Sequence, residues 1–214
     1  MNKTCLLFDC DGTLTDSLST IVRAMQYAFT AASLPVPKDA EVASIIGLSL
    51  DDAVHRLQAP DGLNDAIANH YKKIYKELEQ EVQLFDGVIE TLECLNASGY
   101  HMGVVTGKSK AGMFRVMDRF ALWRYFSVVR SADCCPSKPH PAMVLEAMAA
   151  CNVTAQETLV VGDSIFDVTM ARAAGAEALG VSFGVASADE LYQAGARHVI
   201  DHFTSVLQYV EKKY

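Results

Sequence analysis

The chain has 214 residues, half of them hydrophobic, and a formal net charge of -8 at pH 7. This length allows one sizeable core and a small second one. The acidic balance argues against a general nucleic-acid-binding protein, which needs a basic surface, and no apolar run approaches the roughly 20 residues of a membrane-spanning helix.

The six cysteines, at positions 5, 10, 94, 134, 135 and 151, show no metal-type spacing. Because no signal peptide leads the chain, we expect reduced thiols and a cytoplasmic location. The adjacent pair Cys134 and Cys135 could respond to oxidation, although two ordinary loop thiols are the simpler interpretation.

The first element is an apolar run from Thr4 to Phe8, followed at once by Asp9-Cys10-Asp11-Gly12-Thr13. This pattern predicts a buried strand that delivers two carboxylates onto a loop. Asp9 could attack phosphorus while Asp11 protonates the departing alcohol and later accepts a proton from water. Both acids would repel a phosphate, so this hypothesis requires further acids for magnesium and a lysine downstream. An ordinary turn remains the alternative.

Between residues 16 and 85 the apolar side chains recur at helical spacing, and no strand is evident. Helices are expected from Ile21 to Ala32, from Asp39, from Ser49, and from Asn64 to about Gln80. An all-helical insert directly after the first strand predicts a small separate domain that covers the site.

From Phe85 onward, helical segments alternate with apolar strand-like segments, as a parallel sheet flanked by helices requires. Strands are expected near residues 101–105, 127–129, 158–161, 178–182 and 198–200. The sequence therefore predicts an α/β fold: a Rossmann-like core of residues 1–15 and 86–214, with an inserted all-helical cap of residues 16–85.

Polar residues follow three of these strands, because Asp9, Thr106 and Asp163 each come at the carboxyl end of a different one. In open parallel sheets, ligands bind beyond these ends, where the strand order switches. Lys138 precedes a helix whose free amides favour an anion, which makes it the natural counter-charge. Taken singly, each residue has a structural alternative: a helix cap for Asp163 and an acid in the helix's first turn for Asp167, a strand end for Thr106, and a solvated loop lysine.

Four ordered motifs resemble those of the haloacid dehalogenase superfamily. They are Asp9-Cys10-Asp11-Gly12-Thr13, Val105-Thr106-Gly107-Lys108, Lys138-Pro139 and Gly162-Asp163-Ser164-Ile165-Phe166-Asp167. The resemblance spans nearly the whole chain, and the helical insert is similar to the cap of the group that includes phosphoglycolate phosphatase and β-phosphoglucomutase. It implies a magnesium-dependent phosphatase that hydrolyses a small-molecule phosphate monoester through an aspartyl phosphate, with phosphoglycolate favoured.

The resemblance also implies roles for individual acids. Asp9 would be the nucleophile and Asp11 the general acid and base. The implied magnesium site consists of Asp9, Asp163 and the backbone carbonyl of Asp11, with Asp167 supporting it from outside or through water.

The remaining implied roles concern the substrate. Thr106, the Gly107 amide and Lys138 would hold and neutralise the phosphate, and Thr106 and Lys138 complete the catalytic set. In the cap, Gly47 would let backbone approach the ligand, although it could equally be a glycine that ends a helix. Arg23 could meet a carboxylate or a second phosphate of the substrate, or be solvated.

Two features separate the activities within the superfamily. The dehalogenases lack an acid at the place of Asp11, so its presence favours a phosphate ester. Residues 16–23 lack the histidine that often follows the first motif in mutases, so hydrolysis is favoured over a β-phosphoglucomutase-like transfer. A non-catalytic phospho-ligand binding protein is the third interpretation. Sugar phosphates and nucleoside monophosphates remain open as substrates, and we expect a monomer or homodimer without nucleic-acid or membrane partners.

Overall fold

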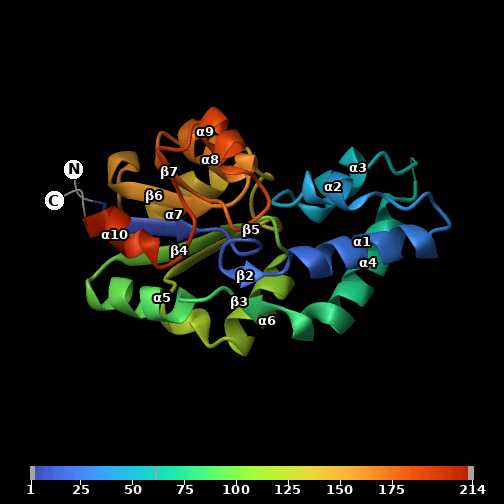
Figure 1. The fold of residues 1–214 in the computed structure, drawn as a ribbon, viewed down its shortest axis with the longest axis horizontal. Coiled ribbons are helices and arrows are strands. Elements are labelled where there is room, and N and C mark those ends of the chain that lie inside the picture. The colour runs from blue at the N-terminus through green and yellow to red at the C-terminus, as the bar shows by residue number, and fades with distance from the viewer. Residues whose placement is uncertain (1–2, 61, 212–214) are drawn as a thin grey trace.

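A six-stranded parallel sheet forms the centre of the computed structural model, which describes residues 3–60 and 62–211 (Figure 1). The remaining positions of the expected core and cap lie outside the described residues. The strands are β1 (Cys5–Phe8), β4 (His101–Thr106), β5 (Val128–Ser131), β6 (Thr158–Gly162), β7 (Glu177–Val181) and β8 (His198–Ile200). Their order is β5-β4-β1-β6-β7-β8, and each neighbouring pair is parallel. The predicted α/β fold is therefore confirmed.

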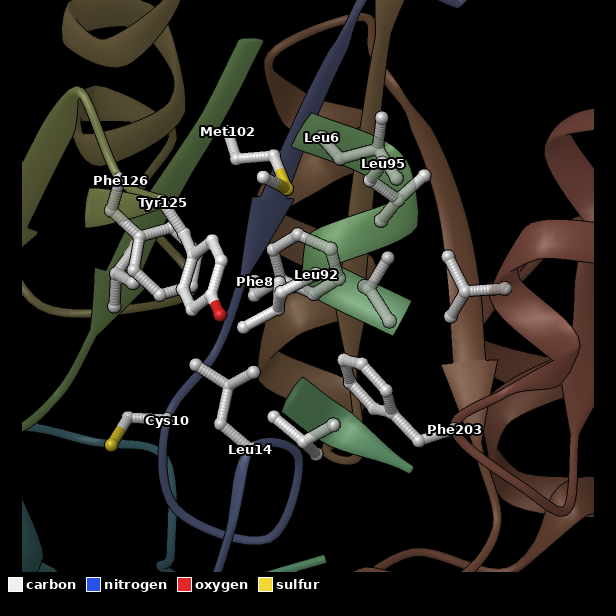
Figure 2. Packing of buried hydrophobic residues seen from close by; sticks show 14 of the residues in the cluster. Leu6, Phe8, Cys10, Leu14, Leu92, Leu95, Met102, Tyr125, Phe126 and Phe203 are labelled. Atoms are coloured by element: carbon white, nitrogen blue, oxygen red, sulfur yellow. The ribbon is translucent and has the colours of Figure 1, made fainter. Parts of the chain in front are cut away.

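Helices cover both faces of this sheet. On one face lie α5 (Val88–Ala97), α6 (Lys110–Arg119) and α10 (Ser205–Glu211); on the other lie α7 (Ala142–Cys151), α8 (Ile165–Ala173) and α9 (Ala188–Ala194). Alternation along β1 divides its side chains between the two layers, because Leu6 and Phe8 enter the first and Leu7 enters the second. Figure 2 shows Phe8 beside Leu92 and Phe203, whose ring centroid lies 5.7 Å from that of Phe8. Each such buried side chain contributes about 1.5–3 kcal/mol to stability.

Four helices form a separate group beyond the sheet (Figure 1): α1 (Leu18–Ala31), α2 (Asp39–Ala43), α3 (Leu50–Arg56) and α4 (Asn64–Leu78). They bury an apolar cluster of their own, which Phe166 of α8 joins. Ser49 is the N-cap of α3, as its sequence position predicts, because its Oγ accepts a hydrogen bond of 3.2 Å from the Asp52 amide. The contact through Phe166 seats this helical group on the sheet layer.

A short antiparallel ribbon connects the two parts of the molecule. Its strands β2 (Thr15–Asp16) and β3 (Gln83–Leu84) pair Thr15 with Leu84 and Asp16 with Gln83. The expectation that residues 16–85 contain no strand is therefore wrong at Asp16 and at Gln83–Leu84. A strand of two residues is too short to show an alternating pattern, and its pairing partner is distant in sequence. The chain passes between the sheet layer and the helical group twice, and both passages lie at this ribbon. We therefore propose the ribbon as the boundary between a cap of residues 16–85 and the core.

Shorter helical turns complete the described chain. The 3-10 helices are η1 (Glu79–Glu81), η2 (Leu122–Arg124) and η3 (Ala155–Glu157). Within residues 3–60 and 62–211, no helix combines the length and the apolar character that crossing a bilayer would demand.

Candidate active site

The strand order switches between β1 and β6. The chain runs outward from β1 to β4 and β5, and then returns to place β6 on the other side of β1. Loops that leave β1 and β6 therefore diverge and open a crevice at their carboxyl ends. Asp9 follows β1, Asp163 follows β6, and Thr106 ends β4 next to β1. The structure thus brings these three residues to one edge of the sheet.

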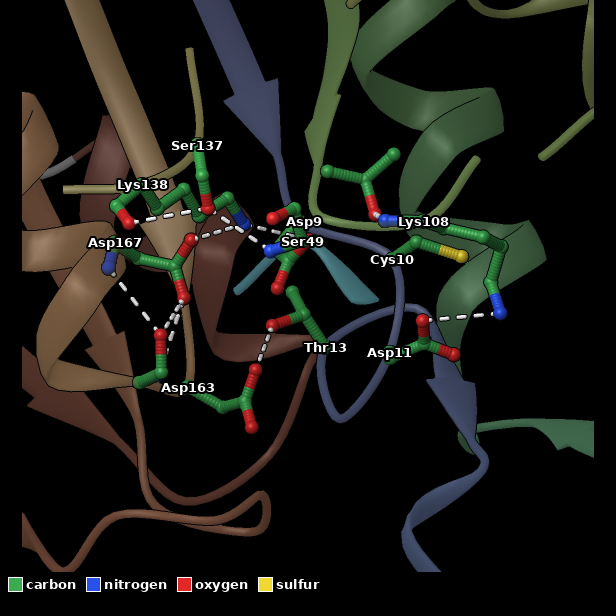
Figure 3. Close-up of polar contacts among 12 residues, drawn as sticks. Asp9, Cys10, Asp11, Thr13, Ser49, Lys108, Ser137, Lys138, Asp163 and Asp167 are labelled. Carbon is green, nitrogen blue, oxygen red and sulfur yellow. Dashed lines mark hydrogen bonds and ion pairs between the residues drawn. The ribbon is translucent and has the colours of Figure 1, made fainter. Parts of the chain in front are cut away.

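A buried charge cluster occupies this crevice. Asp9, Asp163 and Asp167 are each at most 1% exposed, and one carboxylate oxygen of each lies within 4.8 Å of the others. The Lys138 amine reaches into the cluster, with Nζ 2.8 Å from Asp9 Oδ1 and 2.6 Å from Asp167 Oδ1 (Figure 3). Three carboxylates and one ammonium leave negative charge uncompensated. Carboxylate oxygens are the ligands that Mg²⁺ prefers, so the donor set fits a divalent cation.

Asp163 is held by three segments of the chain. Its Oδ1 accepts a 2.9 Å hydrogen bond from Thr13 Oγ1, and its Oδ2 accepts one of 2.9 Å from the Val185 amide. Gly12 has φ +81°, and a Cβ there would lie 2.1 Å from Asp163 Oδ2. A Cβ at Gly184 would lie 2.4 Å from the same oxygen. Only glycine allows the backbone to close around this carboxylate.

Asp167 caps the start of α8 and also contacts the lysine of the cluster. At the start of α8 its Oδ2 accepts from the Ser164 amide (3.1 Å) and from Ser164 Oγ (2.5 Å), while Ser164 Oγ accepts from the Asp167 amide. This capping box fixes the carboxylate. The other oxygen, Oδ1, accepts from Lys138. Asp167 therefore orients the lysine, which leaves Asp9 and Asp163 as the carboxylates best placed to contact a metal directly.

Electrostatics in the cluster follow from burial. Burial, and then the charge of Asp167, raises the pKa of Asp9 well above its ordinary value, and Lys138 offsets this only in part. The same two causes raise the pKa of Asp163 from 3.8 to about 7, against the hydrogen bonds from Val185 and Thr13. Burial lowers the pKa of Lys138, but Asp167 and Asp9 together raise it above the ordinary value, so the lysine stays charged. Without a metal, Asp163 therefore holds its proton to near neutral pH.

These pKa shifts predict how stability depends on pH. Between pH 3.8 and about 7, the folded chain without metal keeps a proton on Asp163 that the unfolded chain has already released. The free energy of unfolding should therefore fall as pH rises from 5 to 7.5, by up to about 1.4 kcal/mol per pH unit for this group. Mg²⁺ should remove this loss, because it binds the ionised form.

The measurement is urea unfolding in EDTA and in excess Mg²⁺ across this pH range, with Asp163→Asn as the matched control. The variant should show a flatter pH dependence and little stabilisation by Mg²⁺. If the free energy of unfolding in EDTA changed with pH equally in the parent and in Asp163→Asn, the attribution of this pH dependence to Asp163 would be contradicted.

Asp11 lies apart from this cluster (Figure 3). Its Oδ1 accepts a 2.6 Å hydrogen bond from Ser17 Oγ, and its Oδ2 lies 3.0 Å from Lys108 Nζ. The structure thus groups the side chains of three of the four acids expected at the metal, whereas the Asp11 carboxylate points to Lys108. A metal contact through the Asp11 backbone carbonyl stays a proposal.

Sequence reasoning assigned no role to two residues beside Asp11. Lys108 belongs to the second motif, so its place two residues after Thr106 was a signal. Tyr75 of α4, whose hydroxyl accepts a 3.1 Å hydrogen bond from Lys108 Nζ, offered none, because this contact joins the helical group to the sheet.

A cavity of about 540 Å³ separates the helical group from the sheet edge. Its polar floor includes Asp9, Asp11, Thr106, Gly107 and Lys108. Helical residues provide the opposite wall, among them the apolar Ile21 and Met25 and the aromatic Tyr71 and Tyr75. An ester could therefore place its phosphate on the floor and its leaving group against this wall.

The loop at Gly47 packs directly on the motif loop at Gly107. A Cβ on Gly107 would lie 2.3 Å from the Leu48 carbonyl oxygen and 2.5 Å from that of Gly47. Gly47 itself has φ +101°, which favours glycine. Nearby, the Ser49 amide donates a 2.9 Å hydrogen bond to Ser137 Oγ, beside Lys138. Gly47 therefore lines the cavity, and its contact with a ligand stays a proposal.

Arg23 is not brought to the cavity lining. Its NH1 lies 2.6 Å from Glu81 Oε2, and both side chains are about half exposed. Ile21 and Met25, which line the cavity, are two positions before and after it on α1. Two residues correspond to about 200° of helix rotation, so Arg23 faces the opposite side. A substrate-binding role for Arg23 has no support in this geometry.

Comparisons with known proteins point to one family. A family model described as "Haloacid dehalogenase-like hydrolase" matches residues 6–181. "Probable phosphatase IndB" of Dickeya dadantii (strain 3937) is 35% identical, over 96% of this chain and 92% of its own length. "Phosphoglycolate phosphatase" of Yersinia pseudotuberculosis serotype I (strain IP32953) is 31% identical, over 94% and 90%.

Two solved structures are similar over nearly their full lengths. A hydrolase from Pseudomonas syringae has TM-score 0.88 and 25% identity, with 98% of this chain and 99% of that chain covered. A predicted phosphoglycolate phosphatase from Haemophilus somnus 129PT has TM-score 0.85 and 26% identity, with 98% of each chain covered.

Proposed function

Because the chain belongs to the haloacid dehalogenase-like hydrolases, we propose that it is a Mg²⁺-dependent phosphatase that hydrolyses a small-molecule phosphate monoester through a phosphorylated Asp9. One observation carries this proposal. The charged amine of Lys138 lies between the buried carboxylates of Asp9 and Asp167, at the edge of the cluster that includes Asp163. Such a site can neutralise a phosphate and orient a carboxylate toward its phosphorus atom.

In the first half of the reaction, a carboxylate oxygen of Asp9 attacks phosphorus. The bond between phosphorus and the ester oxygen breaks, and the electron pair stays on that oxygen. Asp11, in its protonated form, gives its proton to the oxygen, so the alcohol leaves neutral. Asp9 now carries the phosphoryl group as a mixed anhydride.

In the second half, a water molecule attacks the same phosphorus. Asp11, now a carboxylate, takes a proton from the water as the new bond to oxygen forms. The bond between phosphorus and the Asp9 oxygen breaks, which regenerates the Asp9 carboxylate and releases inorganic phosphate. Asp11 ends the cycle protonated, so no proton is lost or gained over the two halves.

Other residues of the site bind and neutralise the phosphate. Thr106, at the end of β4, offers a hydroxyl, and Gly107 offers its amide. Lys138 compensates the charge of Asp9 and of the phosphate together. Asp9, Asp163 and the Asp11 carbonyl would hold Mg²⁺, with Asp167 outside them, and the bound ion would supply further positive charge for the phosphate.

Phosphoglycolate is the favoured substrate. Support comes from a relative named phosphoglycolate phosphatase and from the close packing of the Gly47 loop on the loop that contains Gly107. The cavity of about 540 Å³ also admits larger esters, so sugar phosphates and nucleoside monophosphates belong in the test.

The test is a phosphate-release screen with Mg²⁺ over p-nitrophenyl phosphate and several dozen metabolite phosphates. We expect release of free phosphate, the highest kcat/KM for phosphoglycolate, and loss of turnover in EDTA. A protein that turns over none of these esters would be the phospho-ligand binding protein. Isomerisation of β-glucose 1-phosphate primed by a bisphosphate, without free phosphate, would identify a mutase instead.

A cytoplasmic location is part of the proposal. All six cysteines are free thiols in the structure, and the neighbours Cys134 and Cys135 have their Sγ atoms 3.7 Å apart. Free thiols fit a reducing compartment.

A further inference from the structure

Asp11 is held at both of its carboxylate oxygens. Ser17 Oγ donates to Oδ1 at 2.6 Å, and Lys108 Nζ lies 3.0 Å from Oδ2. Ser17 is fully buried and comes directly after strand β2. The carboxylate therefore has one defined orientation, set by the neutral Ser17 hydroxyl on one side and the Lys108 cation on the other. Figure 3 shows the contact with Lys108.

Lys108 is itself tightly placed. Its side chain is 8% exposed, and its backbone amide donates a 3.1 Å hydrogen bond to Thr106 Oγ1. A lysine amine that is nearly out of water needs partners for its charge and its donors. Among the described residues, Asp11 is the acid that lies within 4.0 Å of it. Lys108 and Asp11 thus compensate each other at the floor of the cavity.

The other partner of Lys108 comes from the helical group. Tyr75 of α4 accepts a 3.1 Å hydrogen bond from Lys108 Nζ, and the same amine lies 4.5 Å from the Tyr75 ring centroid. Tyr71, one turn earlier, stacks on Tyr75 with ring centroids 5.6 Å apart. The amine is therefore fixed from the sheet side by Asp11 and from the helix side by Tyr75.

We infer that Lys108 is a positioning residue that holds the acid-base group Asp11 in its working orientation. Through Tyr75, Lys108 keeps this position only while the helical cap is packed on the sheet edge. The inference rests on the proposed function, in which Asp11 protonates the leaving group. When α4 moves away, Lys108 loses its second partner and water reaches the amine. Asp11 is then held less firmly, so proton transfer is efficient only with the cap in place.

The readout is the dependence of kcat/KM on the leaving group. p-Nitrophenolate leaves readily without a proton, whereas phenolate from phenyl phosphate is more basic and depends more on general acid catalysis. Lys108→Met keeps the length and apolar stem of the side chain and removes its charge. We expect this variant to lose about tenfold more kcat/KM on phenyl phosphate than on p-nitrophenyl phosphate. Lys110→Met, at an exposed lysine two residues away, is the control and should change neither value.

Two further variants make the result decisive. In an Asp11→Asn background, Lys108→Met should change kcat/KM less than twofold, because residues that act through one group are not additive. Tyr75→Phe keeps the stacked ring and removes one hydrogen bond. It should therefore lose about threefold more kcat/KM on phenyl phosphate than on p-nitrophenyl phosphate. Tyr75→Phe also carries the test if Lys108→Met does not fold.

Three outcomes overturn the inference. The first is an equal loss on both esters, and the second is a full additional loss in the Asp11→Asn background; either would mean that Lys108 contacts the substrate or only supports the fold. The third is a parent protein that hydrolyses neither these two esters nor any metabolite phosphate of the screen, which would refute the proposed function as well. An active parent with uniform losses refutes only the role of Lys108.

Discussion

Asp9→Asn is expected to lower kcat by on the order of 10⁴-fold or more on every ester that the parent hydrolyses. The carboxamide nitrogen has no available lone pair and the amide oxygen is a poor nucleophile, so no phosphorylated intermediate forms. Steady-state phosphate release measures the loss, and acid quenching with radiolabelled ester measures the covalent intermediate. The parent should retain label on the protein, and the variant should not.

Stability separates this loss from unfolding. Asp9 is one of three buried carboxylates that share the charge of Lys138, and burial with Asp167 raises its pKa. Replacing it by a neutral amide relieves repulsion, so without metal at pH 8 the variant should be at least as stable as the parent. Asp189→Asn, at an exposed acid of α9, is the control and should keep full activity. Asp9→Asn with activity near that of the parent would rule out Asp9 as the nucleophile.

Lys138→Met is expected to cost both activity and stability. Nζ lies 2.8 Å from Asp9 Oδ1 and 2.6 Å from Asp167 Oδ1, and the lysine side chain has no exposed surface. Its removal leaves three buried carboxylates without a counter-charge, which should destabilise the metal-free protein by about 3 kcal/mol. Loss of the cation beside the phosphate should lower kcat by on the order of 10²- to 10³-fold.

A double variant distinguishes the two costs. Lys138→Met combined with Asp167→Asn removes one positive and one negative charge, so it should recover most of the lost stability while activity stays low. Urea unfolding and phosphate release measure the two quantities on the same samples. Recovery of activity together with stability would mean that Lys138 only compensates Asp167 and has no part in phosphoryl transfer.

Local pattern was enough to predict most of the fold. Apolar runs such as Thr158–Val161 mark buried strands, because a parallel sheet is covered on both faces, and the observed β6 spans Thr158–Gly162. Helical period located the four cap helices, and Ser49 marked the start of α3. The same period also places Arg23 away from the face of Ile21 and Met25, so its position outside the cavity could have been predicted.

The acids at strand ends were predictable for a related reason. Once the strands are parallel, their carboxyl ends meet at one edge, so Asp9, Thr106 and Asp163 must lie near one another whatever the details of packing. The order of the motifs along the chain therefore carries the chemistry of the site.

The sequence by itself determined the main helices, the strands of the parallel sheet and the acids and lysine of the cluster, because strand period, helical period and strand ends are local properties of the chain. Only the tertiary structure decided the β2–β3 ribbon, the contact of Tyr75 with Lys108, and the engagement of Asp11 by Lys108 rather than by the carboxylate cluster. These contacts join residues from different elements, and they form only when the helical group packs on the sheet edge. The residue pattern of the helical group, or of the sheet strands, does not by itself specify how the two pack against each other.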